Sequence, residues 1–267
     1  MKFHLAALAA FLTLCIAPAL RLRADVTLAA AISLKPALEK ARPDLEKAAG
    51  EKITFTFGAS GTLASQIQQG APIDLFLSAD RSTAEKLAAA NAADKASLHV
   101  FAGNELVLIF SPLSSSAPPK SLADIPRLKS LAIGDPKIVP AGAYAQQLLT
   151  SLKLWDTLDK TTQLVTAENV AQVLSFVSRG DVEAGIVYAS DAKAALPAPP
   201  TRATIVVATA DPTLHRPIEY VSVIVSASQN KTAAAKIQQA LTGEKVQSTL
   251  KAFGFTPTPL PPAAKSP

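Results

Sequence analysis

The sequence predicts an α/β protein built from two lobes, and three observations lead to this fold class. From Val26 onward, short apolar runs of β type alternate with segments of helical period, which is typical of α/β units around mostly parallel sheets. The 267 residues exceed one average domain and fit two lobes of ordinary size. Two long extended stretches, at 101–112 and 215–228, join strands without an obvious helix between them, as strands crossing between lobes would.

Residues 1–24 have the pattern of a cleaved secretory signal peptide. Lys2 forms a short basic start, residues 5–16 form an apolar run, and Ala19 or Ala24 provides a small residue for cleavage. A membrane anchor would need roughly 20 apolar residues, and a proline and two arginines interrupt this run. The sequence therefore predicts an exported protein.

Composition limits the partners of the mature chain. Its one cysteine, Cys15, lies within the signal and follows Leu-Thr-Leu rather than the small residue of a lipoprotein signal, so no thiol or disulfide is expected. With 49% hydrophobic and 18% charged residues, the chain is typical of a soluble globular protein. Loss of Lys2, Arg21 and Arg23 with the signal takes the formal net charge from +5 to +2. We expect no binding to nucleic acid or to anionic lipid, because no cluster of basic residues remains.

Nine apolar runs are predicted as strands, with helices in most of the gaps. They cover residues 26–31, 53–57, 74–79, 106–111, 130–134, 162–166, 185–190, 203–208 and 220–226. Residues 25–105 and 219–256 are predicted to form the first lobe, to which the helical segment 230–253 returns, and residues 106–218 the second. Residues 257–267 hold five of the 20 prolines and are predicted as a disordered tail.

Enzyme motifs are missing from the sequence, which favours a binding protein. The stretch FGASGTLASQI superficially resembles a nucleophile elbow, but Gly58 and Gly61 flank Ser60 asymmetrically. No lysine follows, so it is not a phosphate-binding P-loop. After the signal only His99 and His215 remain, far apart and without the spacing of metal ligands. We expect no catalysis, no cofactor and no metal site of the usual kind.

Helices are predicted to begin directly after strands at four places. Ser33 and Ser60 stand at two of these starts, Ala141 at a third, in the Pro-Ala-Gly turn of 140–142, and Val170 at a fourth. One interpretation is that the serines cap the helices' own amides. The other is that several helix N-termini in one cleft present free N–H groups to an anion. In that case the bare backbone of the turn is the functional group, and Gly142 leaves the approach to it open.

Six stretches of the chain resemble the periplasmic molybdate-binding proteins of bacterial ABC transporters. They run in order from about Val26 to Phe255 and read AAAISL, FGASGTLASQIQQGAPIDLFLSAD, AIGDPKIVPAGAYA, LKLWDTL, TAENV and GIVYASDA. The resemblance implies a type II periplasmic-binding-protein fold, with two α/β lobes joined by two crossover strands and a tetrahedral oxyanion in the cleft. It also implies a periplasmic location.

The same resemblance implies an anion site made of the hydroxyls of Ser33, Ser60 and Tyr188 and the amides of Ala141 and Val170. Such donors suit molybdate, which carries no proton and only accepts hydrogen bonds. Phosphate would leave its O–H without an acceptor, at a cost of about 1–3 kcal/mol. None of the five groups titrates between pH 6 and 8, so nearly constant affinity is expected there.

Alternatives exist at two of these positions, and the sequence departs from the family pattern beside two others. Tyr188 and Val170 could be ordinary core residues. Ile32 stands before Ser33 where a small residue is common, and Gly61 follows Ser60 where a hydroxyl is frequent.

The resemblance thus predicts a non-enzymatic, monomeric substrate-binding component. It would bind molybdate, and tungstate of nearly the same size and charge, and deliver the anion to a membrane permease driven by an ATPase. A binding protein for another small oxyanion such as sulfate is an alternative, since only pocket size excludes sulfate. An exported hydrolase with Ser60 as nucleophile is a third possibility, but no base lies at a recognisable spacing.

Overall fold

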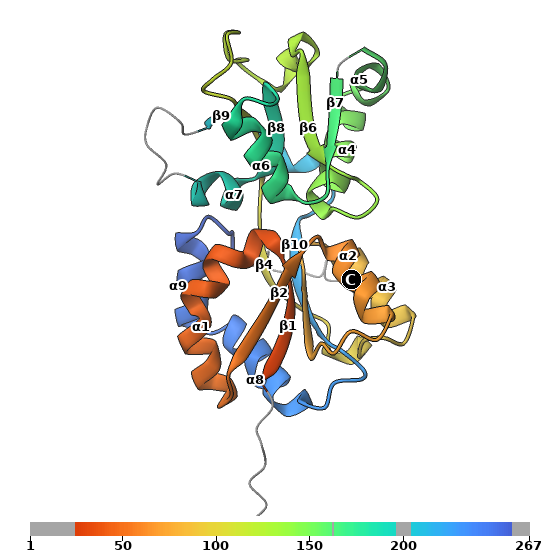
Figure 1. The fold of residues 1–267 in the computed structure, drawn as a ribbon, viewed down its shortest axis with the longest axis vertical. Helices are drawn as coiled ribbons and strands as arrows, with labels where there is room; N and C mark the ends of the chain where they lie inside the picture. Colours follow the sequence, from red (N-terminus) through yellow and green to blue (C-terminus); the bar gives the residue numbers. More distant parts are fainter. Residues whose placement is uncertain (1–24, 162, 196–203, 258–267) are drawn as a thin grey trace, which may run out of the picture.

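The computed structural model describes residues 25–161, 163–195 and 204–257, which form two α/β lobes (Figure 1). This confirms the fold class predicted from the sequence. The predicted signal peptide, all of the predicted tail except Pro257, and single ends of two predicted strands (162 and 203) lie outside the described residues.

The first lobe, the lower one in Figure 1, is built on a five-stranded sheet with the order β2-β1-β3-β10-β4. Its strands are β1 (Val26–Ala31), β2 (Ile53–Gly58), β3 (Leu75–Ser78), β4 (His99–Gly103) and β10 (Glu219–Ile224). Its helices are α1 (Lys35–Ala49), α2 (Ser60–Gln68), α3 (Arg81–Ala89), α8 (Lys231–Leu241) and α9 (Glu244–Ala252). β1 runs parallel to β2 and β3, whereas β10 is antiparallel to β3 and β4.

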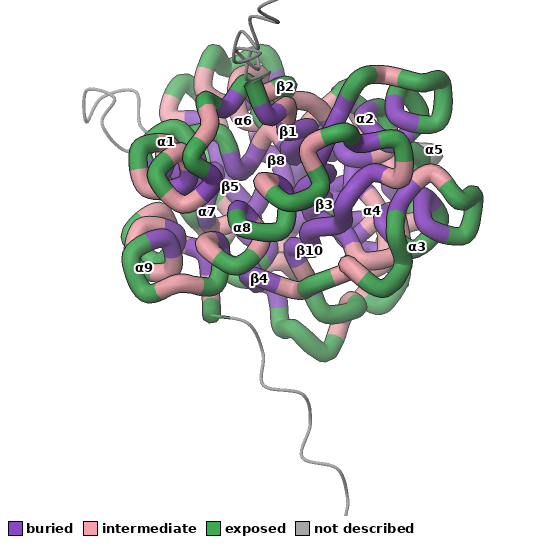
Figure 2. The backbone as a smooth tube through the Cα atoms, turned by 90° about the horizontal axis from the view of Figure 1, so that it is seen from below, coloured by how far each residue is buried: buried purple, intermediate pink, exposed green. Residues whose placement is uncertain are grey.

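Both faces of this sheet are covered because its strands are apolar on both sides. Along β1, Leu28 and Ala30 belong to the core shared with α1, α8 and α9, whereas Ala29 belongs to the smaller core under α2 and α3. Successive side chains of a strand point to opposite faces, so a continuous apolar run predicts this two-sided burial. Figure 2 shows the result, with buried strands in the middle and exposed helical surfaces around them.

The second lobe repeats the arrangement with a sheet of order β7-β6-β8-β5-β9. Its strands are β5 (Leu106–Phe110), β6 (Ser130–Gly134), β7 (Gln163–Ala167), β8 (Ala184–Tyr188) and β9 (Ile205–Thr209). Its helices are α4 (Pro140–Ser151), α5 (Trp155–Thr161), α6 (Val170–Arg179) and α7 (Ala189–Ala194). β6 is parallel to β7 and β8, and β5 is antiparallel to β8 and β9.

The chain crosses between the sheets twice. The first crossing separates β4 from β5 at Asn104 and Glu105, and the second lies between β9 and β10. Both fall within or next to the extended stretches predicted as crossovers. The exact limits proposed for the lobes stay a prediction.

Two predictions about strands differ from the structure. The stretch 101–112 is predicted as extended, with one strand at 106–111, but it holds parts of two strands of different sheets. One is β5, and the other is β4, which was not predicted and begins at the exposed His99. The run 185–190 ends as a strand at Tyr188, because α7 begins at Ala189 and its Asp191 side chain accepts a hydrogen bond from the Tyr188 amide at 3.3 Å. A carboxylate that bonds the amide preceding a helix is an N-terminal helix signal.

The start of α6 is fixed by its flanking residues. The Asn169 side chain accepts a hydrogen bond from the Gln172 amide at 3.0 Å and so caps the first turn. Gly180 ends the helix with φ of 77°, a left-handed conformation that glycine adopts without strain. Val173 and Val177 are buried on one face. The N-terminus of α6 is thereby held at the carboxyl edge of the second sheet.

Candidate functional site

A small cavity where the two lobes meet is lined by all five residues predicted for the anion site. Ser33 and Ser60 come from the first lobe, and Ala141, Val170 and Tyr188 from the second. The other lining residues are Ala31, Ile32, Gly58, Ala59, Ala79, Val139 and Pro140. Within the described part of the chain, no residue of this lining carries a formal charge. The structure therefore brings together a set of neutral polar groups on an otherwise apolar wall.

The ends of strands and the starts of helices place these five residues. Ser33 lies in the short 3-10 helix that follows β1, and Ser60 is the first residue of α2. Ala141 and Val170 lie in the first turns of α4 and α6, and Tyr188 is the last residue of β8. Parallel strands end at a common edge, and ligands of open α/β sheets lie outside that edge. The local folding rules that form these units thus also assemble the site.

The hydroxyl of Ser60 is oriented as a donor. Its Oγ accepts a hydrogen bond from the Ala79 amide at 3.1 Å, and the residue is fully buried. Because an amide only donates, the Ser60 proton is left for another acceptor. The helix begins after Ala59 without a side-chain cap, so the capping interpretation is wrong for Ser60.

The capping interpretation is also wrong for Ser33. Neither the 3-10 helix that contains Ser33 nor α1 has a side-chain cap. Instead, Ser33 Oγ lies 2.9 Å from the hydroxyl of Tyr220, 187 residues away in the sequence. Ser33 therefore uses its side chain for a tertiary contact at the wall of the cavity.

Two backbone amides complete the donor set. Ala141 and Val170 stand in first helical turns, where N–H groups have no acceptor within the helix. The positive ends of the two helix dipoles lie at the same place. The neighbouring Gly142 has a different role from the one expected, because a Cβ there would overlap with the carbonyl oxygen of Gly134. Gly142 is required for packing of α4 against the end of β6.

Tyr188 has a buried hydroxyl without a hydrogen-bond partner among the described residues. The residue is 1% exposed, and its ring packs edge-on against Tyr220 with centroids 5.8 Å apart. Burial raises the pKa of the Tyr188 hydroxyl well above its ordinary value, so the group keeps its proton. Leaving such a donor unpaired costs about 1–3 kcal/mol. A core role explains the buried ring but gives no account of this hydroxyl, which lies in the wall of the cavity among neutral donors.

Asp191 is an acidic group beside the site that sequence reasoning missed. It is buried in α7, and its Oδ2 accepts the Tyr188 amide. Burial raises the pKa of the Asp191 carboxyl to about 7, although the amide of Tyr188 lowers it in part. An ionised Asp191 would repel an anion in the cavity. In the sequence, Asp191 could have been recognised as an acidic residue three positions after the last residue of an apolar strand.

Two sets of contacts hold the lobes together around the cavity. The Gly61 amide, in α2, donates to the Ile138 carbonyl of the second lobe at 3.0 Å. A Cβ at Gly61 would lie 2.7 Å from that oxygen, so the glycine permits this approach. The departure from the family pattern at Gly61 thus has a structural role, namely close contact between the lobes.

The second contact joins Asp80 and Tyr144. The Tyr144 hydroxyl of α4 donates to Asp80 Oδ1 at 3.2 Å, and the carbonyl of Pro217 lies 3.3 Å from the same hydroxyl. Burial alone would raise the pKa of Asp80, but hydrogen bonds from Ser82 and Thr83 outweigh it and hold the pKa below its ordinary value. Asp80 is therefore an ionised acceptor between the lobes.

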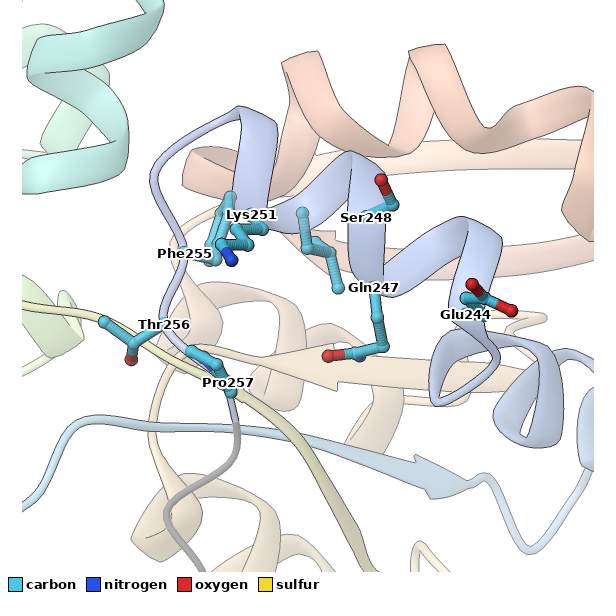
Figure 3. Close-up of a pocket in the computed structure, with 8 residues that line it drawn as sticks. Glu244, Gln247, Ser248, Lys251, Phe255, Thr256 and Pro257 are labelled. Carbon is cyan, nitrogen blue, oxygen red and sulfur yellow. The ribbon is translucent and has the colours of Figure 1, made fainter.

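Other features of the described residues do not form a comparable site. A surface hollow of about 320 Å³ lies beside α9, where side chains of that helix and of residues 255–257 surround it (Figure 3). Its Gln247 amide already donates to the carbonyls of Phe101 and Leu241. His99 is exposed and His215 half-buried, and no group of potential metal ligands occurs in residues 25–161, 163–195 and 204–257. The helices described there include none with the length and apolarity to cross a bilayer.

Comparison with known proteins places the chain in a family. Residues 26–256 match the family model of bacterial extracellular solute-binding proteins. The chain is 35% identical over 237 residues to the molybdate-binding protein ModA of Escherichia coli, covering 86% of this chain and 88% of that protein. It is 34% identical over 239 residues to ModA of Haemophilus influenzae, and the match covers 87% of this chain and 90% of that protein.

Solved structures agree with this result. The periplasmic molybdate-binding protein of Azotobacter vinelandii has a TM-score of 0.76 at 26% identity, covering 89% of this chain and all of that one. The sulfate-binding protein SubI of Mycobacterium tuberculosis has a TM-score of 0.74 at 15% identity, which shows a shared fold alone. The resemblance derived from the six sequence stretches is confirmed. The chain belongs to the family of bacterial extracellular solute-binding proteins, a class of transport component rather than of enzyme.

Proposed function

We propose that this protein binds molybdate in the cavity between its lobes, as the substrate-binding component of an ABC importer. The observation that carries the proposal is the buried, unpartnered hydroxyl of Tyr188 in the wall of a cavity whose polar groups are neutral donors. The relatives that are 34–35% identical and named as molybdate-binding proteins support the choice of anion.

The donor set favours a proton-free anion. Ser60 is fixed as a donor by the Ala79 amide, and the amides of Ala141 and Val170 only donate. Molybdate has four oxygens that accept hydrogen bonds and no proton to place. Hydrogen phosphate would bring an O–H into a wall of donors, at a cost of about 1–3 kcal/mol. Tungstate matches molybdate in charge and nearly in size, so it is expected to bind as well.

Ligand uptake requires the lobes to move. The five candidate residues are each 5% exposed or less, so an anion bound among them would be almost completely removed from solvent. An enclosed site of this kind exchanges its ligand with solvent when the lobes separate. We infer a hinge at the two crossings between the sheets, with the anion favouring an arrangement near the one described.

Calorimetric titration of the purified mature protein with molybdate, tungstate, sulfate and phosphate tests the proposal. Molybdate and tungstate should bind, sulfate more weakly and phosphate least. Ser60→Ala should weaken molybdate binding about 10-fold to 150-fold, the range for a hydrogen bond to a charged group. The control is Ser65→Ala, an exposed serine of the same helix, which should bind like the parent. Tighter binding of sulfate than of molybdate would identify the sulfate alternative, and unchanged binding by Ser60→Ala would exclude this cavity.

Delivery to a permease and a periplasmic location belong to the same proposal. The exported form is expected to act as a monomer and to pass the anion to a membrane permease driven by a cytoplasmic ATPase. Size-exclusion chromatography with light scattering tests the monomer, and molybdate uptake by cells with and without the gene tests the transport role. Uptake that is independent of the gene at limiting molybdate would argue against it.

A further inference from the structure

The amide of Asn104 has a fixed orientation at the first crossing between the lobes. Its Oδ1 accepts hydrogen bonds from the backbone amide nitrogens of Glu105, at 2.9 Å, and Ser190, at 3.4 Å. Both partners are backbone N–H groups, which only donate, so the side-chain oxygen must face them. The Nδ2 group therefore faces the other way, toward Ser190 Oγ at 2.8 Å and Tyr220 Oη at 3.3 Å. Asn104 is consequently a donor to Tyr220.

Tyr220 in turn points its own hydroxyl proton toward Ser33. Its hydroxyl accepts from Asn104, and an Nδ2 group offers no lone pair in return. The Tyr220 proton then points to its remaining neighbour, Ser33 Oγ at 2.9 Å. Tyr220 is fully buried, and burial raises the pKa of its hydroxyl well above the ordinary value, so the proton stays in place.

Ser33 is the last residue of this series of hydrogen bonds, and it lies in the wall of the cavity. Its oxygen accepts from Tyr220, and its own proton needs an acceptor elsewhere. The described residues supply no further hydrogen-bond partner for Ser33. An unrestrained serine hydroxyl both donates and accepts, whereas this one is set to donate into the cavity.

We propose that Asn104 and Tyr220 are positioning residues that hold Ser33 as a hydrogen-bond donor and so make the site select proton-free oxyanions over protonated ones. The inference rests on the proposed function and adds the source of its selectivity. Ser60 is oriented by a single hydrogen bond from the backbone amide of Ala79. Ser33 instead depends on side chains from β10 and from the crossing after β4. Selectivity against protonated anions is thus linked to residues that do not line the cavity.

The test is a double-mutant cycle with Tyr220→Phe and Ser33→Ala. Tyr220→Phe removes the donor and keeps the ring, so Ser33 regains freedom to accept. We expect about tenfold weaker molybdate binding and at least a threefold smaller preference for molybdate over hydrogen phosphate, the latter measured by displacement of molybdate. In the Ser33→Ala background, Tyr220→Phe should change molybdate affinity less than twofold, because its effect passes through Ser33. Preference for molybdate over proton-free sulfate should stay unchanged in Tyr220→Phe.

A second variant keeps the proposal testable if Tyr220→Phe folds poorly. Asn104→Asp is nearly isosteric and replaces the donor to Tyr220 by an acceptor, so the Tyr220 proton turns away from Ser33 and the preference over hydrogen phosphate should fall in the same way. Additive effects of Tyr220→Phe and Ser33→Ala, or an unchanged preference in both variants, would overturn the proposal. If Ser33→Ala loses affinity while Tyr220→Phe binds and discriminates like the parent, only this inference fails. If the parent binds no oxyanion, the proposed function fails and the inference falls with it.

Discussion

Replacing Tyr188 by phenylalanine should move stability and affinity in opposite directions. The change removes one buried oxygen that has no partner among the described residues and leaves the ring, with its edge-on contact to Tyr220, in place. An unpaired buried hydroxyl costs about 1–3 kcal/mol, so the free energy of unfolding without ligand should rise by about 1 kcal/mol. Loss of a hydrogen bond to a charged ligand should weaken molybdate binding by about 1.5–3 kcal/mol, or about 10-fold to 150-fold.

Urea unfolding without ligand and calorimetry with molybdate measure the two effects. Tyr144→Phe is the matched control for stability, because the hydroxyl of Tyr144 has partners in Asp80 and in the carbonyl of Pro217. Its loss should lower the free energy of unfolding by about 1 kcal/mol, with the opposite sign from Tyr188→Phe. The reasoning is refuted if Tyr188→Phe destabilises the ligand-free protein as much as Tyr144→Phe and leaves molybdate affinity unchanged.

Two further predictions concern pH and lobe contact. Molybdate affinity should fall as pH rises from 6 to 8, because the buried Asp191, with a pKa of about 7, becomes ionised and repels a dianion. Calorimetry in buffers of different ionisation enthalpy should show proton uptake on binding above pH 7, and Asp191→Asn should abolish both effects; a flat profile in the parent would show that Asp191 is too remote to act. Gly61→Ala should weaken binding about tenfold, because a Cβ 2.7 Å from the Ile138 carbonyl keeps the lobes apart. Small-angle scattering should then show less contraction with molybdate than in the parent, and an equal contraction would contradict this role.

Sequence patterns predicted the strand ends and helix starts that form the site, because these depend on neighbouring residues. The apolar run of β1 has the bounds Val26–Ala31 in the sequence and in the structure, and a serine placed just after such a strand lies at its carboxyl end. Ser33, Ser60, Ala141 and Val170 were placed at such helix starts by pattern, whereas Tyr188 and the set of five as a whole were implied by the resemblance. The five lining groups alone predicted an affinity for molybdate that does not change with pH. This prediction is revised because of Asp191, which lies in α7. The run 185–190 was predicted as one strand, so the start of that helix was not recognised.

Hydrogen-bond direction could not be predicted in the same way. Ser33 and Tyr220 are 187 positions apart, and Asn104 and Tyr220 are 116 apart, so their contacts depend on how the strands of the first sheet are ordered. The capping interpretation of Ser33 and Ser60 used only neighbouring residues, and for that reason it missed both tertiary partners.

The distribution of donors over two lobes explains how the proposed site could bind tightly and still release its anion. Ser33 and Ser60 belong to one lobe, whereas Ala141, Val170 and Tyr188 belong to the other. A hydrogen bond to a charged group contributes about 1.5–3 kcal/mol, so opening that removes the anion from two of its donors weakens binding by about 3–6 kcal/mol. That corresponds to roughly 10²-fold to 10⁴-fold. A lysine or arginine in the wall would keep attracting the anion across the opened gap, because charge interactions fall off slowly with distance, whereas these hydrogen bonds are lost within a few ångströms. In the proposed transport role, a membrane partner would therefore need only to stabilise the opened arrangement to release the anion, because neutral short-range donors lose their hold once the lobes separate.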